Sequence, residues 1–233
     1  MPALFVMMWP MKYPIRINKY LRDKGLVSRR EADKLISAGE VLVDGRRAEM
    51  GMLVYEGDKV VLRQKQEKEY IYLAYYKPRG LATQATGNFE SVITEWRERG
   101  VFPVGRLDKE SEGLLILTND GRLTTKITGL ESKTKKEYIV NVKEGLSKGV
   151  PAIFEKGMQT KTFGKLLPAG ARIVDRHTLR VVLLEGKRHQ IRVMLSELHY
   201  TITNIKRVRI GHISIGNLRP GQTRKLTEKE IVN

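Results

Sequence analysis

A run of four large aliphatic residues at 114–117 constrains the fold of this chain more than any other stretch. A short unbroken apolar run between glycines, here Gly113 and Gly121, is typical of a strand that is buried on both faces. Because loops held on rigid elements often carry site residues, Asp108 in the charged loop before this run is a candidate site carboxylate, with Arg106 beside it. On spacing alone, a solvated hairpin corner is the better explanation of this loop.

The composition excludes several classes of protein. The chain has 233 residues, enough for one sizeable core or for a medium domain with a small one, and it has no cysteine. Disulfides, thiolate nucleophiles and cysteine-ligated zinc are therefore ruled out. The four histidines show no close pairing, so we expect no metal. No apolar run approaches the ~18 residues of a membrane span. We expect a cytoplasmic monomer that does not contact membranes.

The charge balance is the strongest global feature. Lysine and arginine number 43 against 26 aspartates and glutamates, which gives a formal net charge of +17. Such an excess predicts a polyanionic partner, most often nucleic acid, bound with a strong dependence on salt. Residues 70–233 hold 29 basic and 16 acidic side chains, or +13 of this charge. The larger part of the chain must therefore meet the polyanion itself.

Residues 14–63 are predicted to form a small unit of two helices and a small sheet. The first helix begins near Ile17 and ends at Gly25, and a capping box formed by Ser28 and Glu31 begins the second. A strand near residues 41–43 then enters an Asp-Gly hairpin turn. The order of these elements resembles the small RNA-binding module named after a small-subunit ribosomal protein. In that module the two helices present a basic face to RNA, which here would be Arg16, Lys19, Arg29, Arg30 and Lys34. The alternative is an ordinary solvated face, because acidic residues interleave.

Two segments flank this unit. Residues 1–13 are apolar but lack the features of a signal peptide, so we expect an N-terminal extension. Residues 64–69 are polar and are expected to form a linker. The larger domain, 70–233, alternates strands with separate helices, which predicts an α+β fold with a mixed, mainly antiparallel sheet. The expected helices cover 91–97, 121–127 and 187–198, with a final short helix from 227. The expected strands cover 70–76, 114–117, 135–142 and 178–184, with short strands through 200–226.

Three motifs in the larger domain resemble those of bacterial rRNA pseudouridine synthases of the RsuA/RluB/RluF group. They are GRLDKESEGLL at 105–115, KEY at 136–138 and EGKRHQIRVM at 185–194. Residues 77–80 and 221–227 also fit, so that with the upstream module the resemblance covers nearly everything after residue 13. The three motifs occur in order behind that module, which makes the resemblance highly specific.

The resemblance implies an enzyme that isomerises one uridine, with 23S rRNA as the expected target and a structured stem-loop of an assembling ribosome as the partner. It implies that Asp108 is the nucleophile, that Tyr138 stacks on the base and that Arg192 pairs with Asp108. Arg106 would help to take the nucleotide out of the RNA stack. The further expected RNA contacts are Lys77, Arg188, His189 and Gln190. Isomerisation adds no atom, so no cofactor or metal is expected.

Several alternatives remain open at this point. The group usually has arginine where His189 and Val193 stand, which leaves the choice of target uncertain, and a 16S rRNA target is one alternative. Another is a non-catalytic rRNA-binding or ribosome-assembly factor with the same fold. A glycosidase would need two carboxylates that flank the bond, and Glu110 and Glu112 are expected to be solvated. Asp108 would act either by attack on the anomeric carbon or through an elimination route.

Overall fold

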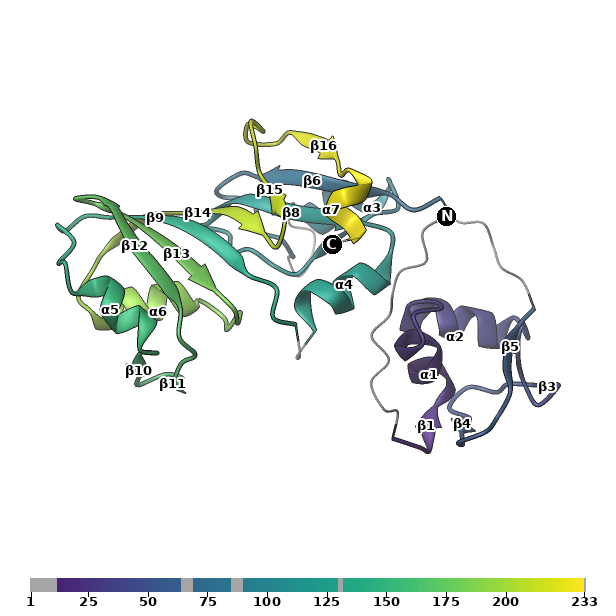
Figure 1. The fold of residues 1–233 in the computed structure, drawn as a ribbon. Helices are drawn as coiled ribbons and strands as arrows, with labels where there is room; N and C mark the ends of the chain where they lie inside the picture. Colours follow the sequence, from purple (N-terminus) through teal and green to yellow (C-terminus); the bar gives the residue numbers. More distant parts are fainter. Residues whose placement is uncertain (1–11, 64–68, 85–89, 130–131, 233) are drawn as a thin grey trace. The chain divides into compact units, whose positions relative to one another are not determined.

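The computed structural model describes residues 12–63, 69–84, 90–129 and 132–232 (Figure 1). The chain divides into two compact units, one of residues 1–70 with 120–123 and one of residues 71–119 with 124–233. Of the expected N-terminal extension and linker, residues 1–11 and 64–68 lie outside the described ranges.

The N-terminal unit contains two short helices and short strands, as expected. Its elements are β1 (Ile15–Arg16), α1 (Ile17–Asp23), α2 (Arg29–Ser37), β2 (Val41–Val43), β3 (Arg46–Arg47), β4 (Leu53–Val54) and β5 (Val60–Leu62). The strands form a three-stranded sheet of order β3-β2-β5 and a two-stranded sheet of β1 and β4. Both helices bury apolar side chains in one core, which includes Ile17, Leu21, Ala32, Ile36 and Val41.

Local sequence signals explain two features of this unit. Ser28 begins α2, and its Oγ accepts a hydrogen bond from the Glu31 N–H at 3.3 Å. Between β2 and β3, Asp44 and Gly45 have φ values of 49° and 78°. A two-residue hairpin turn of type I′ needs positive φ at both positions, which is why Asp-Gly is favoured there.

The rest of the chain alternates strands and helices. The elements are β6 (Tyr72–Lys77), α3 (Val92–Arg97), β7 (Phe102–Val104), β8 (Glu112–Thr118), α4 (Gly121–Thr128), β9 (Lys136–Val142), α5 (Val150–Glu155), β10 (Gln159–Thr160), β11 (Gly164–Lys165), β12 (Gly170–Asp175), β13 (Thr178–Leu183), α6 (Gln190–Glu197), β14 (Ile202–Ile210), β15 (Ile213–Ser214), β16 (Thr223–Lys225) and α7 (Glu228–Val232). The main sheet has the order β12-β13-β9-β14-β8-β6-β16, with β15 paired to β14 and β7 to β8. Only the β14–β8 pair is parallel among these described strands. The predicted α+β fold is confirmed.

Strand β8 is the predicted buried strand. Its four aliphatic residues at 114–117 are fully buried. Leu115 and Leu117 pack with Tyr75 and with Val92 and Trp96 of α3. Further along the sheet, α5 and α6 lie against one side of β9 and β13 (Figure 1), where their apolar residues form the largest core cluster. The loop between β7 and β8 therefore begins and ends on elements that the core holds in place.

The structure corrects the sequence prediction in several places. The segment expected to form short strands contains β14, the longest strand described, with nine residues. Helix α5 and strands β10 to β12 were not predicted, because α5 is shorter than two turns and β12 is largely exposed. Helix α6 begins at Gln190 instead of Lys187, because His189 before it takes a left-handed conformation with φ of 58°.

Candidate active site

Asp108 lies in the loop between β7 and β8. Its carbonyl oxygen accepts a hydrogen bond from the Ser111 N–H at 3.1 Å, so the loop closes a tight turn directly after it. Its side chain is 35% exposed and thus remains within reach of a ligand. The solvated hairpin corner considered from spacing alone does not describe this loop, because its carboxylate contacts His189, which precedes α6, and Arg192 of α6.

A cavity of about 1200 Å³ opens beside this loop within the larger unit. Seven of the residues expected in the site line it: Arg106, Asp108, Tyr138, Arg188, His189, Gln190 and Arg192. They come from the β7–β8 loop, from β9 and from the start of α6, which are far apart in sequence. The tertiary structure brings the three motifs to one cavity.

The nearest described partner of the Asp108 carboxylate is His189. The distance from His189 Nδ1 to Asp108 Oδ2 is 3.0 Å, whereas Arg192 Nε lies 3.7 Å from the same oxygen. Arg192 instead donates from Nη2 to the Glu110 carbonyl at 3.2 Å and to Ser111 Oγ at 3.0 Å. Arg192 was expected to be the main partner of Asp108. In the structure Arg192 binds Glu110 and Ser111, which follow Asp108 in the loop, and its contact with the Asp108 carboxylate is longer than that of His189.

Tyr138 lies in a row of residues that crosses four strands. On β9 it is paired with Arg207 of β14, which is paired with Gly113 of β8, which is paired with Lys77 of β6. Tyr138 is only 9% exposed and belongs to the core cluster, yet it also lines the cavity. Residues paired across neighbouring strands point to the same face, and of this row Tyr138 and Arg207 line the cavity.

Lys77 and Gln190 are buried, which differs from the expectation that they contact RNA. Lys77 is fully buried, and its Nζ donates to the carbonyl oxygens of Pro78 and Leu81 at 2.7 and 2.6 Å. Burial lowers the pKa of the Lys77 amine to about 8, although the charge of Asp108 acts in the opposite direction. Gln190 is 3% exposed. Its Nε2 donates a hydrogen bond to Glu185 Oε1 at 2.9 Å, and its Oε1 accepts one from the Lys187 N–H at 3.1 Å.

Arg207 and Thr83 are among the polar residues at the cavity that the sequence did not predict. Arg207 is 4% exposed and lines the cavity from β14, and Thr83 is 3% exposed and lines it from the segment after β6. The alternation along β14 offers a signal for Arg207, because Ile205 and Arg207 share the buried face while Lys206 between them is less buried. No sequence pattern marks Thr83.

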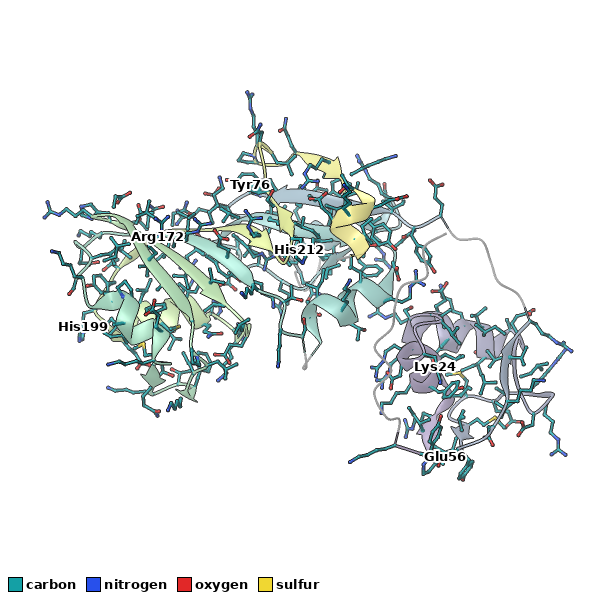
Figure 2. The ribbon with its side chains drawn as sticks, viewed as in Figure 1. Lys24, Glu56, Tyr76, Arg172, His199 and His212 are labelled. Atoms are coloured by element: carbon teal, nitrogen blue, oxygen red, sulfur yellow. The ribbon has the colours of Figure 1, made fainter. Side chains whose placement is uncertain are left out.

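The other carboxylates of the loop have separate partners. Glu110 is exposed and lies 3.5 Å from Arg79 Nε, whereas Glu112, which was also expected to be solvated, is partly buried. Glu112 accepts hydrogen bonds from Tyr76 Oη at 3.0 Å and from Asn204 Nδ2 at 2.7 Å. Burial, reinforced by this bond, raises the pKa of Tyr76, which is labelled on β6 in Figure 2, to about 12. Neither glutamate faces Asp108 as the second member of a glycosidase pair.

Two features are absent from the described residues. No group of three or more His, Cys, Asp or Glu side chains could hold a metal ion within the described ranges. No helix there is long and apolar enough to cross a membrane.

The five basic residues expected to bind RNA in the N-terminal unit are all exposed: Arg16, Lys19, Arg29, Arg30 and Lys34. Lys19 makes a loose ion pair with Asp23 at 3.9 Å. The remaining four side chains thus present positive charge from the start of α1 and from α2.

Comparisons with known proteins agree with this architecture. A family model described as RNA pseudouridylate synthase matches residues 71–197, and one described as S4 domain matches residues 15–60. The dual-specificity RNA pseudouridine synthase RluF of Escherichia coli (strain K12) is 32% identical over 94% of this chain and 78% of its own length. The ribosomal large subunit pseudouridine synthase B of Bacillus subtilis (strain 168) is 29% identical over 93% of each chain.

A solved structure shares the fold. The crystal structure of a pseudouridylate synthase superposes with a TM-score of 0.70 and covers 93% of this chain and 98% of that one, at 23% identity. This chain thus belongs to the RNA pseudouridylate synthase family and is an RNA-acting pseudouridine synthase of the RluF/RluB type with an N-terminal S4 domain.

Proposed function

We propose that this protein isomerises one uridine of 23S rRNA to pseudouridine, with Asp108 as the catalytic carboxylate. The observation that carries the proposal is the position of Asp108 at a cavity of about 1200 Å³ that Tyr138, His189 and Arg192 also line. Large-subunit rRNA is favoured for two reasons. The relative from Bacillus subtilis is named for it, and the loop sequence at 109–113 resembles that of the family members that act on large-subunit rRNA. A cytoplasmic location goes with this substrate.

The reaction breaks the bond between the sugar and N1 of uracil, turns the base and joins the sugar to C5. The proton at C5 leaves and N1 gains one, so no atom is added and no cofactor is required. One carboxylate is sufficient, either as a nucleophile at the anomeric carbon or in an elimination route. Tyr138 would lie against the base, while His189 and Arg192 orient the Asp108 carboxylate through contacts of 3.0 and 3.7 Å.

The target base must first leave the RNA stack, because a base stacked inside a helix cannot enter the cavity. Arg106 is exposed at the cavity beside Asp108, and we propose that its side chain fills the space of the extruded nucleotide. Arg188 is exposed at the same cavity and would contact a phosphate. Lys77 and Gln190, being buried, would support the loops rather than contact RNA.

The S4 domain would supply a second contact with rRNA. Replacing Arg29 and Arg30 together by alanine is expected to weaken RNA binding and to flatten its salt dependence by up to about two in the slope of log K against log salt, because each phosphate contact releases counterions. Filter binding at several salt concentrations measures this slope. The control variant Lys148→Ala/Lys156→Ala removes two exposed charges from the other unit. An unchanged slope in the Arg29/Arg30 variant would exclude these two contacts.

The experiment that tests the function is pseudouridine mapping across 23S and 16S rRNA. Wild-type protein is expressed in a host that lacks its own RluF- and RluB-type enzymes, and the expected result is one restored site in 23S rRNA. A restored site in 16S rRNA alone would replace the proposed target with the small-subunit one. If the protein binds rRNA but restores no site, the result would contradict the proposed function and favour a non-catalytic rRNA-binding or ribosome-assembly factor.

A further inference from the structure

The main chain directly before Asp108 is held by a buried threonine from another segment. Thr83 is 3% exposed. Its Oγ1 donates a hydrogen bond to the Leu107 carbonyl at 2.6 Å and accepts one from the Leu107 N–H at 3.0 Å. A single hydroxyl therefore satisfies both peptide groups of the residue that precedes Asp108.

Arg207 joins the same loop to strand β8. From its place on β14, Nη1 donates to the Arg106 carbonyl at 3.2 Å and Nε donates to the Leu114 carbonyl at 2.8 Å. The Arg106 carbonyl lies in the loop before Asp108, and Leu114 lies in β8, the strand that follows the loop. Arg207 is 4% exposed, so water does not compete strongly for these bonds.

The Leu107 side chain provides a third anchor. It is 8% exposed and belongs to the core cluster with Tyr138 and Ile191. Residues 106 and 107 are thus held through two carbonyls, one N–H and one apolar side chain, while the neighbouring side chains of Arg106 and Lys109 are exposed. The part of the loop after Asp108 is held separately, through the bonds of Arg192 to the Glu110 carbonyl and to Ser111 Oγ.

We propose that Thr83 and Arg207 are positioning residues that fix the peptide groups of residues 106 and 107 and thereby aim the Asp108 carboxylate into the cavity. The hydrogen bonds described for both side chains end on main-chain groups, so their effect on the reaction passes through the loop. This inference rests on the proposed catalytic role of Asp108. Its physical basis is that a misplacement of about 1 Å at a reacting group lowers a rate by about 10²-fold.

The test is Thr83→Val, which keeps the shape of the side chain and removes the hydroxyl. Its kcat for pseudouridine formation is expected to fall about 10²-fold, whereas KM and the Kd for RNA stay close to the wild-type values. Thr83→Ser keeps the hydroxyl and is expected to recover most of kcat. Thr83→Ala removes the hydroxyl without placing a methyl group against Leu107. This second variant keeps the test valid if Thr83→Val does not fold.

Thr160→Val is a matched control in the same unit. Thr160 is also 3% exposed, and its Oγ1 donates to the Gly164 carbonyl at 3.1 Å and accepts from the Phe163 N–H at 3.0 Å. Thr160 is not among the residues that line the cavity. Both valine variants lose two buried hydrogen bonds and are expected to lose similar stability in urea unfolding, but only Thr83→Val should lose kcat.

The outcomes separate this inference from the proposed function. If Thr83→Val and Thr83→Ala keep kcat, or lose no more of it than Thr160→Val, the positioning role is wrong while active wild-type protein still supports the proposed function. If serine fails to recover what valine loses, the hydroxyl is not responsible and the inference also fails. Wild-type protein that forms no pseudouridine on any rRNA would remove the proposed function, and the positioning role with it.

Discussion

Asp108→Asn is expected to lower kcat for pseudouridine formation by at least about 10³-fold, which corresponds to about 4 kcal/mol of transition-state stabilisation. The amide has the shape of the carboxylate and keeps one oxygen to face His189 Nδ1, which lies 3.0 Å away in the wild-type protein. It lacks the negative charge that makes a carboxylate nucleophilic. Single-turnover kinetics on an rRNA fragment, with RNA affinity measured in parallel, separates loss of chemistry from loss of binding.

Glu110→Gln is the matched control for Asp108→Asn. Glu110 lies in the same loop and is exposed, and among the described residues its carboxylate pairs with the exposed Arg79 at 3.5 Å. Its carbonyl, which accepts from Arg192, is unchanged by the substitution. We expect near wild-type kcat for Glu110→Gln. Retained activity in Asp108→Asn, or an equal loss in both variants, would contradict the catalytic assignment.

Gly113→Ala is expected to lower the free energy of unfolding by about 3–5 kcal/mol, at the upper end of single substitutions. Gly113 has a φ of 108°, and a Cβ atom there would lie 2.3 Å from the Arg207 carbonyl oxygen and 2.8 Å from its nitrogen. These are backbone atoms of β14, so the clash cannot be relieved by a side-chain rotation. Relief would require the parallel β8–β14 pair to separate, and urea denaturation measures the loss.

Gly221→Ala serves as the control for Gly113→Ala. Gly221 has a similar φ of 83°, but a Cβ atom there would meet nothing within 4 Å. This variant isolates the strain of positive φ, which is about 1–2 kcal/mol for a residue with a Cβ. Equal losses in the two variants would show that the close approach of β14 contributes nothing. We also expect Gly113→Ala to lose activity, because Arg207 holds the Asp108 loop from the same pairing.

Local sequence signals predicted those parts of the fold that neighbouring residues determine. The apolar run at 114–117 is the buried strand β8, Asp44-Gly45 is the hairpin turn, and Ser28 caps α2. The edge strand β12 carries no such signal, because most of its side chains face solvent. Its strand conformation comes from pairing with β13, which is a tertiary interaction.

The motifs predicted which residues belong to the site, whereas only the fold gave the distances between them. The motifs named Asp108, Tyr138 and Arg192, and all three line one cavity. They gave no information about distances, and His189 rather than Arg192 is the nearer partner of Asp108. Lys77 belongs to the stretch 77–80 that also fitted the resemblance, but the fold buries it.

The sequence by itself determined the α+β class and the RNA-binding module, and it predicted the principal site residues, because these depend on periodicity, capping and short motifs that act over a few neighbouring residues. Only the tertiary structure decided which buried side chains hold the Asp108 loop. Thr83 and Arg207 lie 24 and 101 residues from their partners, Leu107 and Arg106. The Arg207 contact arises from the register of β14 against β8 and β9. The Thr83 contact arises where the segment after β6 meets the β7–β8 loop. No local pattern encodes either contact.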